Sequence, residues 1–148
     1  MLFRSVGDGR GMAAMFMLGA EGVQVGTRFV VADESIVHQN YKERLIASKD
    51  TDSAVTGRSH GHPIRTLRNQ NTREYIKMEA AGATFEELEL LTFGGLRKAV
   101  IDGDVKNGSV MAGQIAGLIK KQQSCEEIIK ELVSETENLL RGDRKSVV

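Results

Sequence analysis

The sequence predicts an α/β protein whose later part is largely helical. Residues 12–18 are rich in Ala, Met and Leu, which favour a helix, and Gly19 stands where the C-terminal cap of that helix is expected. The β-branched run that follows predicts a short buried strand over 22–25. A helix followed by a strand within about twenty residues is typical of a sheet built from βα repeats. Because one strand cannot form a sheet, its partners must lie in the weakly patterned middle of the chain or elsewhere.

An amphipathic helix is expected over 33–50, where apolar residues recur at helical spacing. These residues are Ile36, Val37, Tyr41, Leu45 and Ile46. Residues 51–68 hold few apolar side chains before Ile64, and they predict a loop or a short extended piece. A polar helix is expected to follow, from about Asn69 to Ala81.

Two capping boxes predict where later helices begin. Thr84 is followed three residues on by Glu87, and Ser124 is followed in the same way by Glu127. Between these two helices, the small residues of 108–123 predict another helix, suited to close packing. The last helix carries an apolar stripe made of Ile128, Ile129, Leu132, Val133, Leu139 and Leu140.

Composition and charge restrict the classes of function. The chain has 148 residues with 20 basic and 20 acidic side chains, and a net charge of zero argues against nucleic acid or an anionic membrane as the main partner. The single cysteine, Cys125, allows no internal disulfide, so a reducing, cytoplasmic setting is expected. No apolar run has the length of a membrane span, and residues 1–11 lack the apolar centre of a signal peptide.

The end of the predicted strand is the stretch most suggestive of chemistry. Gly26 has no side chain, so its amide can approach an anion closely, and the hydroxyl and amide of Thr27 can add hydrogen bonds. A short helix starting there would present further free N–H groups, and Arg28 follows at once. The alternative is an ordinary strand end, because a Val-Gly-Thr sequence occurs by chance in many strands.

Four blocks of the sequence resemble the flavin-dependent enoyl-acyl-carrier-protein reductase II family, which is grouped with the nitronate monooxygenases (2-nitropropane dioxygenase-like proteins). The blocks are residues 7–35, 38–50, 61–75 and 103–119. The resemblance implies an FMN-containing (β/α)8 barrel with a smaller helical domain. It implies that this chain is a C-terminal fragment of the barrel, about strands 7 and 8, with a largely helical C-terminal region.

The same resemblance implies three regions. Residues 6–50 would form the end of the FMN-binding barrel, and residues 51–96 would form a smaller inserted or lid region. Residues 97–142 would form the C-terminal helices.

The resemblance also assigns site residues. Gln24, Val25, Gly26 and Thr27 match the family's flavin-binding stretch, with the FMN phosphate at the end of the strand. Met111 and Gln114 are expected to line the pocket, and tight helix packing is the alternative for this segment. No catalytic residue is expected in this chain, because the family's catalytic histidine lies upstream and His38, His60 and His62 do not match it.

One departure from the family falls at the phosphate site. The family has Ala-Ala-Gly-Gly-Ile immediately before the stretch that begins at Gly7, whereas this chain has Leu-Phe-Arg-Ser-Val. A phosphate-contacting glycine of the family would fall at Ser5. This departure accompanies a second expectation, that residues 1–5 and 143–148 are non-native scars, because codons for both ends can be written as sequences of common short-read sequencing adapters. The alternative is a pair of ordinary chain ends.

The implied activity is that of an NADH-dependent enoyl reductase of fatty-acid synthesis. NADH would reduce FMN, and a hydride would pass to an enoyl thioester carried by acyl-carrier protein, in an enzyme expected to be a homodimer. The alternatives are a nitronate monooxygenase, or a non-catalytic interaction protein, since the chain alone is expected to be inactive without the catalytic half. The nicotinamide preference, NADH or NADPH, stays open.

Three further features have ordinary explanations. His60 and His62 lack the nearby ligands of a metal site, so no metal is expected, and polar loop contacts explain them. The alternative that the family resemblance implies is that residues 61–65 approach the nicotinamide cofactor or the substrate. Arg65 and Arg68 could meet an acidic carrier or phosphates, but a solvated surface is the simpler interpretation. Cys125 lies at a helix start that would favour a thiolate, yet a passive thiol is expected.

Overall fold

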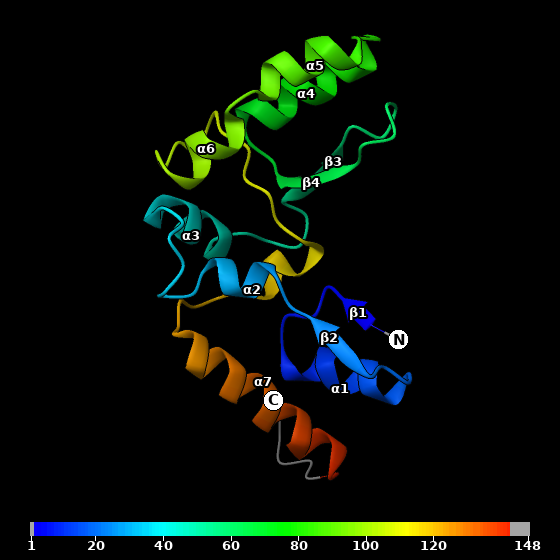
Figure 1. The fold of residues 1–148 in the computed structure, drawn as a ribbon, viewed down its shortest axis with the longest axis vertical. Helices are drawn as coiled ribbons and strands as arrows, with labels where there is room; N and C mark the ends of the chain where they lie inside the picture. Colours follow the sequence, from blue (N-terminus) through cyan, green and yellow to red (C-terminus); the bar gives the residue numbers. More distant parts are fainter. Residues whose placement is uncertain (1, 143–148) are drawn as a thin grey trace.

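The structure is a computed structural model that describes residues 2–142, and Figure 1 shows it as an elongated arrangement of three groups of elements. The group at one end contains β1 (Leu2–Arg4), α1 (Gly9–Met17), β2 (Gly22–Gln24) and α7 (Cys125–Leu140). The middle contains α2 (Thr27–Val30), α3 (Gln39–Ile46) and the 3-10 helix η1 (Gln114–Leu118). The far end contains β3 (Ser53–Thr56), β4 (Ile64–Leu67), α4 (Gln70–Ala80), α5 (Phe85–Thr92) and α6 (Gly95–Val100).

The first sheet is a parallel pair joined by a crossover helix. Strand β1 pairs with β2 in register Leu2 to Gly22, and α1 connects the two strands. This βαβ unit confirms a strand in the predicted region 22–25, ending one residue earlier. The strand is not buried as predicted, because Gly22 and Val23 are half-buried and Gln24 is exposed. Residues 2–4 therefore occupy a strand position. Their adapter origin stays a prediction, and the second expected scar, 143–148, lies outside the described residues.

The second sheet explains the weakly patterned middle of the chain. Strands β3 and β4 form an antiparallel hairpin in which Ser53 lies opposite Leu67. Residues 110–112 run along the other edge of β4, with the Leu67 amide donating to the Val110 carbonyl across 2.8 Å and the Ala112 amide donating to Arg65 across 3.2 Å. The helix expected over 108–123 is therefore wrong. Pairing with β4 satisfies this backbone and buries Val110 and Ala112, and only the short η1 follows.

The helix expected over 33–50 is shorter than predicted. It begins at Gln39, because His38 is its N-cap and accepts a hydrogen bond from the Asn40 amide through Nδ1 across 3.1 Å. Ile36 precedes this helix and is 87% exposed, so it belongs to no buried face.

Both capping boxes are confirmed. The Thr84 amide donates to the Glu87 carboxylate at the start of α5, and the Ser124 amide donates to the Glu127 carboxylate at the start of α7, each across 2.9 Å. The reciprocal backbone-to-hydroxyl bonds are also present. Each of these helix starts is set by contacts between residues three apart in the sequence, which is why the sequence alone could predict it.

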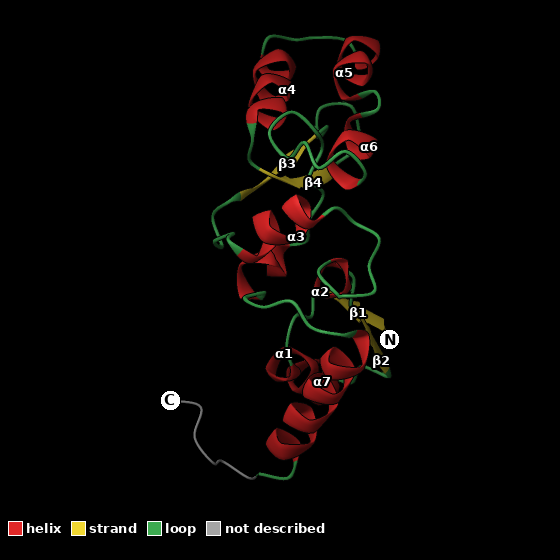
Figure 2. Cartoon of the chain, turned by 90° about the vertical axis from the view of Figure 1, so that its left-hand side faces the viewer, coloured by secondary structure: helices red, strands yellow, loops and turns green. Residues whose placement is uncertain are grey.

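Two apolar clusters hold the elements together. The larger one lies in the middle and gathers Val31, Tyr41, Leu45, Leu67, Ala99, Val110, Ala112, Ala116 and Ile119. The smaller one joins Ala32 to Ile128 and Leu132 of α7. Figure 2 shows α7 beside α1, and there the Gly9 amide donates to the Glu135 carboxylate across 2.7 Å.

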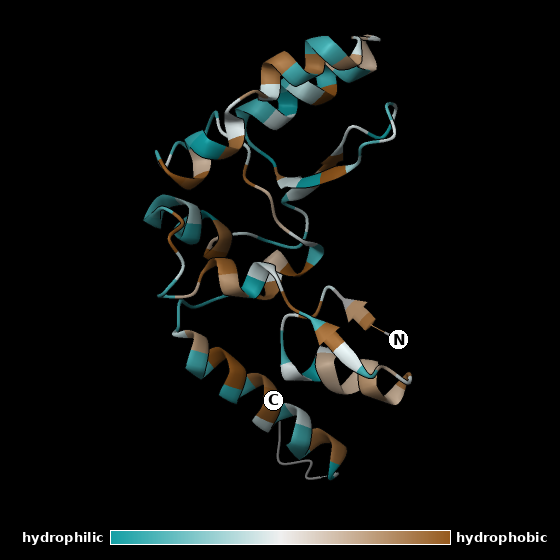
Figure 3. Cartoon of the chain, viewed as in Figure 1, coloured by the Kyte–Doolittle hydropathy of each residue, from teal (hydrophilic) through white to brown (hydrophobic). Residues whose placement is uncertain are grey.

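The rest of the apolar stripe of α7 is not buried. Ile129, Val133, Leu139 and Leu140 are each at least 40% exposed, and Figure 3 shows apolar residues along this helix. No helix within residues 2–142 is long and apolar enough to cross a membrane.

Candidate functional site

A hollow lies where the parallel strands end, and we call it the strand-end hollow. Its lining residues are Ser5, Val6, Gln24, Gly26, Thr27, Gly113 and Ile115. Ser5 and Val6 follow β1, whereas Gln24, Gly26 and Thr27 come from the end of β2 and the start of α2. The carboxyl ends of parallel strands are where βα proteins bind their ligands, so this position fits a binding site.

Gly26 leaves an open cradle in this hollow. A Cβ atom placed at Gly26 would meet no atom of the described chain within 4 Å. Its φ of −112° is one that any residue adopts, so neither packing nor backbone conformation requires glycine here. The space that a side chain would fill is therefore free for a ligand to approach the backbone closely.

Thr27 links the hollow to η1. Its Oγ1 accepts a hydrogen bond from the Gly113 amide across 2.9 Å. A hydroxyl has one proton to donate in addition to its acceptor lone pairs, so the Thr27 hydroxyl can still donate to an anion. The contact also places Gly113 on the wall of the hollow, a position that sequence analysis missed. Its signal in the sequence is only one glycine in a run of small residues.

Ser5 adopts a backbone conformation that favours glycine. Its φ is +68°, and it is the one residue other than glycine with positive φ in the described chain. This is the position at which the family resemblance places a phosphate-contacting glycine. The backbone at this position is therefore left-handed, a conformation that glycine adopts without strain, although a serine occupies it.

The other predicted flavin-binding residues separate into two environments. Gln24 is exposed and lines the strand-end hollow. Val25 instead packs against the smaller apolar cluster of Ala32, Ile128 and Leu132, and it is not among the residues that line the hollow.

Arg28 points away from the hollow. It is only 5% exposed, and its guanidinium donates to the Gln123 side chain and lies 3.6 Å from the Glu131 carboxylate of α7. Hydrogen bonds from Lys121 and Gln123, with Arg28 as a further positive charge, hold the pKa of Glu131 below its ordinary value. The cation that follows the strand is thus explained by packing against α7.

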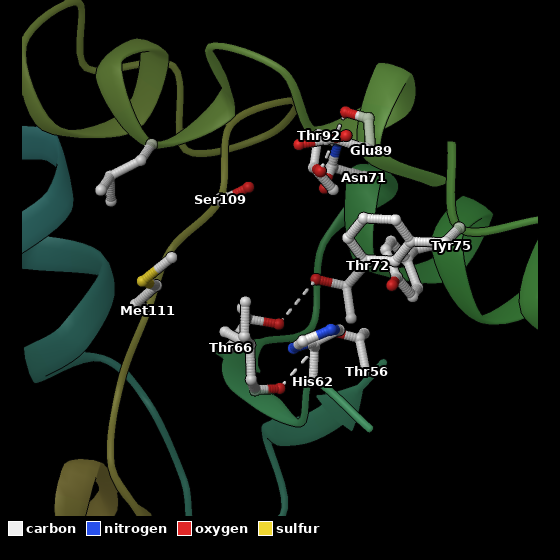
Figure 4. Close-up of a pocket in the computed structure, with 13 residues that line it drawn as sticks. Thr56, His62, Thr66, Asn71, Thr72, Tyr75, Glu89, Thr92, Ser109 and Met111 are labelled. Atoms are coloured by element: carbon white, nitrogen blue, oxygen red, sulfur yellow. Dashed lines mark hydrogen bonds between the residues drawn. The ribbon is translucent and has the colours of Figure 1, made fainter. Parts of the chain in front are cut away.

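A second cavity of about 260 Å³ lies between the hairpin and α4 and α5, and we call it the hairpin cavity (Figure 4). Thr66 and Thr72 lie on its floor, with their hydroxyls 3.1 Å apart, and Thr72 donates to the Leu67 carbonyl across 3.0 Å. The rings of His62 and Phe85 lie 5.2 Å apart at its rim.

Met111 lines the hairpin cavity, whereas Gln114 lines neither this cavity nor the strand-end hollow. The Met111 carbonyl accepts a hydrogen bond from the Tyr41 hydroxyl across 2.7 Å, a contact that sequence analysis also missed. Because Met111 and Gly113 are two residues apart in an extended segment, the two sites lie side by side along one short piece of chain.

The remaining candidates take no part in these sites. Within residues 2–142, no three His, Cys, Asp or Glu side chains are placed to share a metal ion. Desolvation and a hydrogen bond to the Glu34 carboxylate raise the pKa of the Cys125 thiol, which favours the passive thiol. His60 contacts the Ser59 hydroxyl across 2.9 Å at the tip of the hairpin, as a polar loop residue.

Comparison with known proteins identifies the class. The sequence profile of the nitronate monooxygenase family matches residues 5–135, so the chain belongs to this family of FMN-dependent oxidoreductases. Within it, the chain is similar to FabK from Thermotoga maritima, with 42% identity and a TM-score of 0.87 over 97% of this chain and 46% of that one. A methionine-to-alanine variant of that protein matches with 39% identity and a TM-score of 0.81.

A curated relative is named as a nitronate monooxygenase. A probable nitronate monooxygenase of Staphylococcus saprophyticus is 31% identical over 133 residues, which is 90% of this chain and 37% of that protein. The chain thus spans less than half the length of the relatives that it matches. The fold is a mixed α/β partial domain that matches part of these barrel structures.

Proposed function

We propose that this chain is part of an FMN-dependent enoyl-acyl-carrier-protein reductase II that uses NADH. Its 42% identity to FabK, against 31% to the Staphylococcus saprophyticus protein, supports the reductase over the monooxygenase. In this proposal β1 and β2 stand in the places of barrel strands 7 and 8. The observation that carries it is the strand-end hollow, which gathers the ends of both strands around an open glycine.

The residues of the hollow fit the phosphate of FMN by shape and by hydrogen bonding. The cradle at Gly26 admits a bulky group next to the backbone, and the Thr27 hydroxyl has a proton to donate. Ser5 supplies a loop with left-handed geometry on the opposite side. Since Arg28 is engaged with α7, neutral donors hold the phosphate here.

The chain's role in the reaction is to bind and orient. FMN, when bound, supplies the hydride transfer from NADH to the enoyl thioester. Met111 lines the hairpin cavity two residues before Gly113 of the strand-end hollow, where it can bound the space that the substrate enters. The chain supplies no proton donor in this proposal, because the family's catalytic histidine lies in the part that this chain does not contain.

Grafting tests the proposal. Residues 2–142 replace the matching part of FabK in one hybrid and the matching part of the Staphylococcus saprophyticus monooxygenase in another. We expect the FabK graft to retain FMN and to oxidise NADH in the presence of a crotonyl thioester, and the second graft to show no oxidation of a nitronate. Activity of the second graft alone would reverse the assignment.

The phosphate assignment has its own test in the FabK graft. Riboflavin has the same ring system as FMN but no phosphate, so we expect it to bind at least about tenfold more weakly, as lost hydrogen bonds to a charged group predict. Equal affinity for the two flavins would contradict a phosphate at the strand-end hollow.

A further inference from the structure

Cationic side chains gather on the outer side of α4. Two adjoining hollows share Gln70 and Glu74. The cations that line them are Arg44, Arg73, Lys77, Lys98 and Lys106. Glu74 is the one carboxylate in either lining. We call this surface the cationic face. Since the whole chain has no net charge, this is a local excess of positive charge.

Carboxylates compensate only part of this positive charge. Arg44 lies 3.5 Å from Asp52, but in residues 2–142 no ion pair within 4.0 Å involves the other four cations. Arg73, Lys77, Lys98 and Lys106 are also exposed. Two carboxylates lie among these four exposed cations, Glu74 in the lining and Asp104 near Lys98, so an excess of positive charge remains that attracts an anionic surface.

The cationic face is held in shape by the start of α4. The Asn69 side chain donates to the carbonyls of Val105 and Gly108 across 2.9 and 2.7 Å, and its oxygen accepts from the Thr72 amide. The Gln70 amide donates to the Lys106 carbonyl across 3.1 Å. These bonds fix α4 against the turn at 105–108, so the cations of both segments keep a constant spacing.

The cationic face also borders the hairpin cavity. Asn71 lines one of its hollows and the hairpin cavity at the same time. The first turn of α4 is thus the wall between a charged outer surface and an inner cavity that contains Met111. A partner resting on the outer surface would stand beside the entrance to the cavity.

We propose that the cationic face docks an acidic protein surface. Given the proposed function, on which this inference rests, that protein is the acyl carrier that brings the enoyl thioester to the cavity. The face lacks the aromatic side chains on which nucleic-acid bases stack, since none lines either hollow. Its apolar lining is limited to Val105 and Leu91, which gives a membrane little to bury.

The direct test is binding of a labelled holo-acyl-carrier protein to the complete 148-residue chain, measured by fluorescence anisotropy. We expect the double variant Arg73→Glu, Lys77→Glu to weaken binding at least about tenfold at an ionic strength of about 0.01 M, and less at about 0.15 M, because salt screens surface charges. The matched control Arg10→Glu, Arg58→Glu reverses two exposed charges outside the face and should change affinity less than about twofold. Circular dichroism checks that each variant keeps its helices.

Three results would overturn the inference. They are absence of binding by the folded wild-type chain, equal loss in the control variant, and tighter binding of a DNA duplex or anionic vesicles than of the carrier protein. In the FabK graft, the double variant should raise KM for crotonyl-acyl-carrier protein but not for crotonyl-coenzyme A. A graft that is inactive with both thioesters refutes the proposed function, whereas an active graft with unchanged KM values refutes only the docking surface.

Discussion

The Thr27 hydroxyl accepts a hydrogen bond from the Gly113 amide across 2.9 Å, and this contact joins residues 86 positions apart in the chain. It is the structural relationship that makes the strand-end hollow a site. It ties the end of β2 to the segment that contains Met111, in addition to the packing of α2 against η1. The proton of the same hydroxyl can still be donated to a ligand, so the Thr27 side chain both holds the hollow together and can bind a ligand in it.

Replacing Thr27 by valine should therefore damage both roles. Thr27→Val leaves the Gly113 amide without its acceptor, which we expect to lower the free energy of unfolding by about 1–3 kcal/mol. In the FabK graft it should also weaken FMN binding. Thr27→Ser keeps the hydroxyl and is the control, expected to lose less than half as much stability in urea unfolding. Equal losses in the two variants would show that the methyl group matters and the hydrogen bond does not.

The contribution of Gly26 to ligand binding can be measured separately from its contribution to stability. Because a Cβ at Gly26 meets nothing within 4 Å, Gly26→Ala should change stability by less than about 0.5 kcal/mol yet weaken FMN binding by the graft at least about tenfold. Gly57→Ala is the contrast. Its φ is +74° and a Cβ there would clash with the His62 carbonyl oxygen, so Gly57→Ala should lower the free energy of unfolding by more than about 1 kcal/mol. If Gly26→Ala leaves the FMN affinity unchanged, the open space at Gly26 is not part of the FMN site.

Ser5 offers a gain of stability. Its φ of +68° costs a residue with a Cβ about 1 kcal/mol, so Ser5→Gly should stabilise the chain by roughly that amount and restore the glycine that the family resemblance places there. Ser134→Gly makes the same replacement at an exposed position in α7 and should instead destabilise by about 0.5–1 kcal/mol. Thermal unfolding of the two variants should thus shift in opposite directions, and a shared direction would contradict strain at Ser5.

Tyr41 predicts how stability depends on alkaline pH. Burial raises the pKa of Tyr41 from its ordinary value of 10 to about 12, so the unfolded chain loses the phenolic proton first as pH rises. The stability that Tyr41 contributes is complete below pH 10 and is lost between pH 10 and about 12, by roughly 2–3 kcal/mol in total. The free energy of unfolding of Tyr41→Phe should therefore fall less steeply between pH 10 and about 12 than that of the wild type. The fall that remains in Tyr41→Phe comes from other groups and is subtracted from the wild-type curve. Tyr75 is less buried, so Tyr75→Phe should retain most of this pH-dependent loss of stability. An unchanged slope in Tyr41→Phe would show that Tyr41 is not its source.

Local signals predicted well where the physics is local. The capping boxes at Thr84 and Ser124 depend on contacts three residues apart, and both are confirmed. The pairing of residues 110–112 with β4 joins segments that are distant in sequence, so the small residues of 108–123 indicated a helix instead. For the hairpin itself, the sequence predicted only a loop or a short extended piece. Ile36 shows the same limit, because helical spacing cannot reveal that His38 starts the helix later.

The candidate site was predictable to a similar extent. Gly26 and Thr27 could be singled out because a glycine and a hydroxyl at a strand end carry their own chemical logic. Gly113 could not, since only the fold brings it to Thr27. The direction of the Arg28 side chain could not be predicted either, because it is set by Gln123 and Glu131, about 100 residues later in the chain.

The inward turn of Arg28 means that the two proposed ligands of this chain are recognised by different forces. With that guanidinium held against α7, a phosphate in the strand-end hollow is gripped by short, directional, uncharged donors, whose strength is nearly independent of dissolved ions. A partner on the cationic face is attracted at longer range by charges that salt weakens. Raising the ionic strength should therefore dissociate the acyl-carrier protein while FMN stays bound.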